Sequence, residues 1–228
     1  MQVHTGVTTS YAVSVLSRFT NDPGPRHIKY LKQLILYLIG TVDDRLIFRK
    51  VPMTAARPNA IPQLQASYMM DADLAGQDKY SQESFIALWG GDITNHGSHK
   101  QSTMSYGTYE SELKTVCNFT KSEVVSNHKI YNAMGFLQLP AKIHEDNSAV
   151  VTVSKTQHLS KAGRHLPLWL SWVQELVHDG IIEIVHIRSE SNFADIGTKY
   201  LPKDVFTRIE AQLVDKEISK RNNPRLFR

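Results

Sequence analysis

The sequence of 228 residues contains a single cysteine, Cys117, so no disulfide can form within the chain. This scarcity favours a reducing intracellular compartment, either cytoplasmic or nuclear. The longest apolar run covers 34–40 and is too short to span a bilayer. The first residues also lack the basic start and the continuous apolar core of a secretory signal. We therefore expect neither a disulfide-rich secreted domain nor a membrane protein.

Several common kinds of active site are missing as well. The chain has no glycine-rich phosphate loop of either common type, which excludes nucleotide-driven motors and dinucleotide dehydrogenases. Its ten histidines are scattered without the spacing of zinc ligands. Cys117 lies among apolar residues of an expected helix, where a thiol is a small hydrophobic group rather than a nucleophile. The remaining candidates for chemistry are carboxylates.

The charge of the chain is mildly basic, with a formal net charge of +4 and a pI of about 9.1. This balance is compatible with a polyanionic partner without requiring one. The last residues, 216–228, are strongly basic. They fit a segment that follows a phosphate backbone, and equally a solvated terminus.

Hydrophobic periodicity and turn residues divide the chain into four parts. Segment 10–40 reads as helical with a turn at 21–25, whereas later segments alternate between strands and helices, including helices over 192–200 and 203–214. This order predicts a mixed sheet with helices packed on it, an α/β (α+β) fold. The expected parts are a helical segment over 1–51, a proline-containing linker over 52–65, a sheet domain over 66–204, and a final helix with a basic tail over 205–228.

Acidic residues stand where the expected strands and helices begin or end. Asp71 and Asp73 in MMDADLAG share one face of a strand, because side chains alternate along it. The further candidates are Glu110, Glu112, Glu145, Asp146 and Asp195. Hard divalent ions prefer carboxylate oxygens, so converging acids would bind them. Glu110 and Glu112 point about 200° apart around a helix, and Glu145 and Asp146 face opposite sides of a strand, so spacing alone does not select one of each pair.

Four motifs, in order, resemble a known family. They are DADLAG (71–76), SHKQSTMSYGTYESELKTV (98–116), HEDNSAVVTVSK (144–155) and HIRSESNFADIGTKYLP (186–202). Together they are similar to the ribonuclease H domain of copia-type LTR retrotransposon Pol polyproteins. The preceding stretch, 11–48, resembles the end of the reverse transcriptase in the same polyproteins, with its thumb or connection helices. Each motif alone is weak, whereas four in order with the upstream segment are specific.

The resemblance implies a ribonuclease H-like fold, with a five-stranded mixed sheet flanked by helices and preceded by a small thumb- or connection-like segment. It also implies hydrolysis of the RNA strand of RNA–DNA hybrids with two Mg²⁺ or Mn²⁺ ions. The residues that match the family's ligands are Asp71, Glu112, Asp146 and Asp195. Expected contacts with the nucleic acid are Lys100, Asn147 and Lys199. Asp73 is expected to cap the following turn.

The chain departs from the family in ways that indicate an alternative function. Gly197 stands where the family has leucine, and Pro167, Trp169 and Ser171 stand where it has Asp, Arg and His. The start at a methionine within a polyprotein also suggests a remnant that has become separate. The alternative is a catalytically weak or inactive protein that binds nucleic acid, or a protein partner through the helix with Trp169 and Trp172. If the chain is part of a polyprotein, the rest of the reverse transcriptase is the partner.

Overall fold

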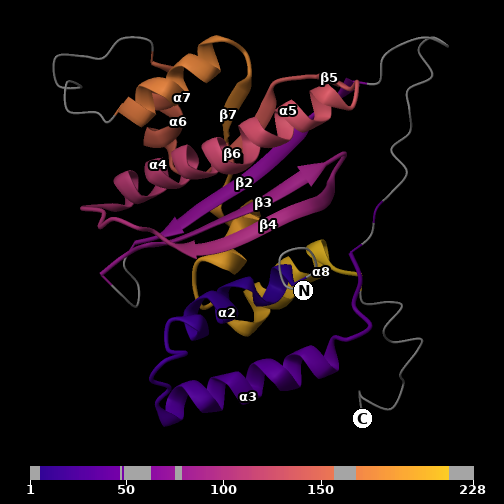
Figure 1. Cartoon of the computed structure of the whole chain (residues 1–228), viewed down its shortest axis with the longest axis vertical. Coiled ribbons are helices and arrows are strands. Elements are labelled where there is room, and N and C mark those ends of the chain that lie inside the picture. Colours follow the sequence, from indigo (N-terminus) through magenta and orange to yellow (C-terminus); the bar gives the residue numbers. More distant parts are fainter. Residues whose placement is uncertain (1–5, 47, 49–62, 75–78, 157–167, 216–228) are drawn as a thin grey trace.

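A mixed five-stranded sheet forms the centre of the computed structural model, which describes residues 6–46, 48, 63–74, 79–156 and 168–215 (Figure 1). The strands lie in the order β4-β3-β2-β6-β7. Neighbours β2, β3 and β4 pair antiparallel, whereas β6 and β7 run parallel to β2. The sheet contains β2 (Ala66–Asp73), β3 (Gln82–Trp89), β4 (Asp92–Lys100), β6 (Ala141–Glu145) and β7 (Ile182–His186). The expected fold, a five-stranded mixed sheet of ribonuclease H-like type, is confirmed.

The antiparallel strands β3 and β4 form a hairpin that turns at a Gly-Gly pair. Gly90 and Gly91 have φ angles of 62° and 90°, a region that residues with a Cβ rarely adopt. A second, small sheet pairs β1 (Gln63–Leu64) in parallel with β5 (Leu137–Gln138). Strand β1 lies within the expected linker over 52–65, of which residues 52–62 lie outside the described part of the chain.

One face of the sheet is covered by helices that bury the larger apolar core (Figure 1). These are α4 (Thr108–Phe119), the π-helical turn η2 (Thr120–Val124), α5 (Val125–Ala133), α6 (Ser148–Lys155) and α7 (Leu168–His178). Tyr68 and Met70 lie two residues apart on β2, so both side chains point into this core, where they are fully buried. Trp172 on α7 packs against the same core, and the side chain of Trp169 lies outside the described part.

The opposite face carries segments from both ends of the chain. They are η1 (Val7–Thr9), α2 (Ser10–Ser17), α3 (Pro25–Gly40), η5 (Phe193–Gly197) and α8 (Lys203–Leu213), with η4 (Ser189–Ser191) leading into η5. A second core joins Val7 to Ile86 of β3 and Ile209 of α8. The Tyr37 hydroxyl on α3 also donates to Glu210 Oε1 over 2.5 Å. The N-terminal segment thus packs with the C-terminal helix, and the four-part division of the chain stays a prediction.

Most predicted elements are present, and one is wrong in type. The helices over 10–40 and 203–214 and the turn at 21–25 are confirmed. The expected helix over 192–200 is instead the short 3-10 helix η5, because Thr198 N donates back to Asp195 O three residues earlier, over 3.2 Å. The basic tail, 216–228, lies outside the described part. Within that part, no helix combines the length and apolar character that a bilayer crossing requires.

Gly197 explains one departure from the family pattern. A Cβ at this position would lie 2.7 Å from the Cβ of Ser84 on β3, and the Gly197 carbonyl accepts a hydrogen bond from Ser98 Oγ over 2.5 Å. The Ser84 side chain therefore fills the space that a larger residue at 197 would need. This close approach lets η5 lie directly on the sheet.

We predict that Gly197→Ala lowers the free energy of unfolding by about 1–3 kcal/mol, because an added methyl group must displace the strand beneath it. Urea denaturation followed by circular dichroism measures the change. Gly40→Ala at the end of α3 is the matched control, because nothing lies within 4 Å of its added Cβ. Equal stability of the two variants would contradict the tight contact.

Candidate metal centre

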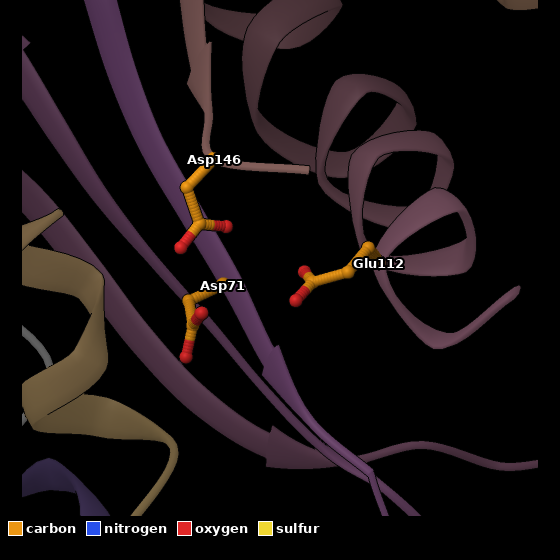
Figure 2. Close-up of side chains that lie close together, drawn as sticks. All are labelled: Asp71, Glu112 and Asp146. Carbon is orange, nitrogen blue, oxygen red and sulfur yellow. The ribbon is translucent and has the colours of Figure 1, made fainter. Parts of the chain in front are cut away.

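Three carboxylates from three different elements converge where β2 ends (Figure 2). Asp71, Glu112 and Asp146 each offer an oxygen, and these oxygens all lie within 4.8 Å of one another. Asp71 and Glu112 are buried, at 2% and 5% exposure, and Asp146 is partly buried. Their side chains point toward one another in Figure 2. We call Asp71, Glu112 and Asp146 the acid cluster.

The sheet topology brings the acid cluster together. Asp71 lies on the central strand β2, opposite Ser84 of β3. Asp146 directly follows β6, the parallel neighbour of β2, so both carboxylates emerge at the same edge of the sheet. Glu112 comes from α4, which packs over β2. His186 Nε2 donates to the Asp146 carbonyl over 3.1 Å and fixes the turn after β6.

The structure separates the two glutamates of α4. Glu112 points to the acid cluster, whereas Glu110 forms an ion pair of 2.8 Å with Lys114 and accepts the Tyr106 N–H over 2.9 Å. The ion pair and this backbone hydrogen bond lower the pKa of Glu110. Glu110 is therefore an ionised acid paired with Lys114, whereas Glu112 belongs to the acid cluster.

Glu145 adds a buried acid beside the cluster. It is fully buried, and its Oε1 accepts the backbone N–H of Asn147 over 3.0 Å. Its Oε2 is buried and has no hydrogen-bond partner among the described residues. Burial raises the pKa of Glu145, and the charges of Asp146 and Asp71 raise it further. Glu145 is outside the group of three oxygens but increases the negative charge around them.

Asp195 approaches the cluster from the other side, on η5. It is outside the group of three converging carboxylates, but burial and then the charge of Asp71 raise its pKa. Asn192 attaches η5 to the sheet, because its Nδ2 donates to the Met70 carbonyl over 2.8 Å and its Oδ1 accepts Ala194 N–H over 3.2 Å. The ligand role of all four acids stays a prediction.

The three expected nucleic-acid contacts lie around the same edge, each with an observed interaction of its own. Lys100 Nζ lies 5.1 Å from the centre of the Tyr80 ring. Asn147 caps α6 by accepting the N–H groups of Ala149 and Val150. Lys199 forms ion pairs with acids of the site. Their contacts with nucleic acid stay predictions.

The charge of the cluster fits a hard divalent cation. Burial, followed by the charges of Glu145, Asp71 and Asp146, raises the pKa of Glu112 strongly. Within the part of the chain that the structure describes, Glu112 Oε2 is buried and has no hydrogen-bond partner. Oxygen donors that are crowded, anionic and not fully hydrogen-bonded are the donor set that Mg²⁺ and Mn²⁺ prefer. The residues present therefore fit a divalent metal.

Sequence reasoning missed two residues that shape the site, Asn192 and Thr198, and left the role of a third, Glu145, undecided. Thr198 Oγ1 donates to Asp71 Oδ2, and Asn192 anchors η5 to β2. Glu145 was considered only as the alternative to Asp146. Thr198 and Asn192 are both fully buried, although their residue types are usually exposed. Their positions three residues on either side of Asp195 were the signal that could have identified them.

We predict that Glu112→Gln stabilises the metal-free protein by about 1–3 kcal/mol near pH 8. The folded-state pKa of Glu112 is raised, so its carboxyl contributes stability below the unfolded pKa and loses it as the pH rises toward the folded value. Glutamine does not ionise, so its advantage should disappear toward about pH 4. Urea denaturation in a chelator across this pH range measures the difference.

Glu110→Gln is the control for this prediction. It removes a surface ion pair with Lys114 and should cost about 0.5 kcal/mol or less. A Glu112→Gln protein that is less stable than the wild type at every pH would show that the cluster is not strained by repulsion.

Comparisons with known proteins agree with the sequence motifs. No protein-family model matches the chain. The chain is 26% identical over 199 residues to the retrovirus-related Pol polyprotein from transposon TNT 1-94 of Nicotiana tabacum, which is 86% of this chain and 14% of the relative. It is also 26% identical over 207 residues to the Pol polyprotein from transposon RE1 of Arabidopsis thaliana, 90% of this chain and 13% of the relative.

The chain thus spans about a seventh of the length of these curated relatives. Among solved structures, it is similar to the N-terminal RNase H domain of rv2228c from Mycobacterium tuberculosis, with 11% identity and a TM-score of 0.43, covering 65% of this chain and 98% of that one. The fold assignment itself rests on the strand order and directions described above. Over nearly its whole length, the chain resembles the Pol polyproteins of copia-type LTR retrotransposons, as its four ordered motifs indicated.

Proposed function

We propose that the chain is a metal-dependent ribonuclease H, which hydrolyses the RNA strand of RNA–DNA hybrids. The convergence of Asp71, Glu112 and Asp146 within 4.8 Å is the observation that carries this proposal. The similarity to retrotransposon Pol polyproteins supports it. Asp195, across from the cluster on η5, completes the four acids that the family motifs specify.

Asp71, Glu112, Asp146 and Asp195 would hold two Mg²⁺ or Mn²⁺ ions. When bound, such ions activate a water nucleophile and stabilise the charge of the attacked phosphate and of its leaving oxygen. The contribution of the chain is to fix the carboxylates before substrate arrives. Thr198 holds Asp71, His186 holds the Asp146 backbone, and Asn192 holds η5 with Asp195.

Basic and polar groups around the acid cluster would position the nucleic acid. Lys100 ends β4, Asn147 begins α6 and Lys199 follows η5, so all three stand at element ends near the cluster. Lysine side chains bind phosphate oxygens without reading sequence. Choice of the RNA strand would depend on the 2′-hydroxyl groups that only RNA presents in the minor groove.

The test is cleavage of an RNA–DNA hybrid in Mg²⁺ or Mn²⁺, with each strand labelled separately. We expect the wild-type protein to cut the RNA strand and spare the DNA strand. Asp71→Asn and Asp146→Asn should each reduce the rate by at least about a hundredfold, because each removes a charge from the metal site. Circular dichroism checks that the variants keep their fold.

Asp73→Asn and Glu110→Gln are the matched controls, because both change an acid close in sequence to a cluster residue but outside the cluster. They should retain activity within about threefold, which corresponds to less than about 1 kcal/mol of barrier. If wild type and Asp71→Asn are equally inert with metal, the enzymatic proposal fails. The alternative, a retrotransposon-derived binding protein, would then be favoured.

A further inference from the structure

Lys199 places an ammonium group directly between two acids of the site. Its Nζ lies 2.7 Å from Asp195 Oδ1 and 3.6 Å from Asp71 Oδ2. The Asp71 side chain is only 3% exposed, whereas that of Lys199 is 37% exposed. The ammonium thus reaches from the surface into the buried anionic end of β2.

The turn that presents Asp195 also presents Lys199. The two residues are four apart, and the Lys199 backbone N–H donates to the Asp195 carbonyl over 3.4 Å. Between them, Thr198 donates its hydroxyl to Asp71 Oδ2. The backbone of Lys199 is therefore held by the turn after η5, at a position from which its side chain reaches both acids.

The anionic site consequently has two unequal halves. On one half, the Lys199 ammonium lies between Asp71 and Asp195. On the other half, Asp71 meets Glu112 and Asp146, with which Lys199 forms no ion pair in the described part of the chain. The influence of Lys199 on the pKa of Glu112 is smaller than that of any of the neighbouring acids.

We propose that the Lys199 ammonium occupies the cation position between Asp71 and Asp195 in the metal-free protein, and that a divalent ion binding there must displace it. A first ion would bind at Asp71, Glu112 and Asp146 without this displacement. The inference rests on the metal site of the proposed function. It gives Lys199 a role in metal loading, distinct from its expected contact with phosphate.

The chemistry of lysine suits a group that leaves. A long, flexible side chain that is partly exposed can swing into solvent without unfolding the turn. Arginine keeps the positive charge but binds carboxylates through two parallel hydrogen bonds, so it would be harder to displace. Methionine has a similar length and no charge. The two substitutions should therefore change metal affinity in opposite directions.

The experiment is calorimetric titration of the full chain with Mn²⁺, without nucleic acid. The weaker Mn²⁺ site is the one between Asp71 and Asp195. Relative to wild type, Lys199→Met should bind Mn²⁺ at this site about tenfold more tightly, and Lys199→Arg should bind it several-fold more weakly. The affinity of the tighter Mn²⁺ site, at the acid cluster, should change less in both variants. Lys129→Met, on the exposed surface of α5, is the control and should titrate like wild type.

A second measurement follows the lysine itself. The ¹⁵N signal of the Lys199 ammonium, assigned by its absence in Lys199→Arg, should be visible without metal and disappear or shift on addition of Mg²⁺. This readout is taken on the wild-type protein, so it depends neither on activity nor on the stability of Lys199→Met.

The outcomes separate this inference from the proposed function. If wild type binds Mn²⁺ and cleaves hybrid while both Lys199 variants bind Mn²⁺ as it does, the displacement proposal alone is overturned. A shift of both variants in the same direction also overturns it, because a purely structural role would produce that pattern. If no protein in the series binds Mn²⁺, the metal-dependent function fails together with it. Opposite shifts in the two variants support the proposal.

Discussion

Carboxylates of Asp71, Glu112 and Asp146 repel one another where β2 ends, and this repulsion is the constraint on which the site depends. Burial strengthens it, because charges interact more strongly away from water. Glu145 increases the negative charge nearby. Such an arrangement costs folding stability, so it persists only where packed elements hold the acids in place. The two apolar cores on opposite faces of the sheet provide that support.

Much of the fold could be predicted from the sequence, because its elements carry strong local signals. Gly90-Gly91 is a local turn signal between β3 and β4, and the turn at 21–25, with Gly24 and Pro25, indicated where α3 begins. The helix predicted over 192–200 is wrong, because the conformation of this segment is set by tertiary contacts. Asn192 bonds to the Met70 carbonyl on β2, and Gly197 lies against Ser84 on β3. Neither contact has a periodic signature in the sequence.

The acids that converge in the structure were all among the candidates that the sequence offered, whereas the electrostatics of the candidate site could not be predicted. Spacing alone does not decide between Glu110 and Glu112, or between Glu145 and Asp146. Only the family motifs favoured Glu112 and Asp146. In the structure Glu110 pairs with Lys114, whereas Glu112 and Asp146 belong to the acid cluster, and their role as ligands stays a prediction. The position of Lys199 between Asp71 and Asp195 could not be foreseen, because it depends on how η5 lies on the sheet. A lysine four residues after an aspartate is common on any exposed helix.

Anomalous diffraction from crystals grown with Mn²⁺ shows whether these acids form a metal site. Data collected at the manganese absorption edge should show an anomalous peak for an ion that is bound by Asp71, Glu112 and Asp146. Where a second peak is present, Lys199 Nζ should have moved away from Asp195. A map without a peak at the acid cluster, with Lys199 still between Asp71 and Asp195, would contradict the account.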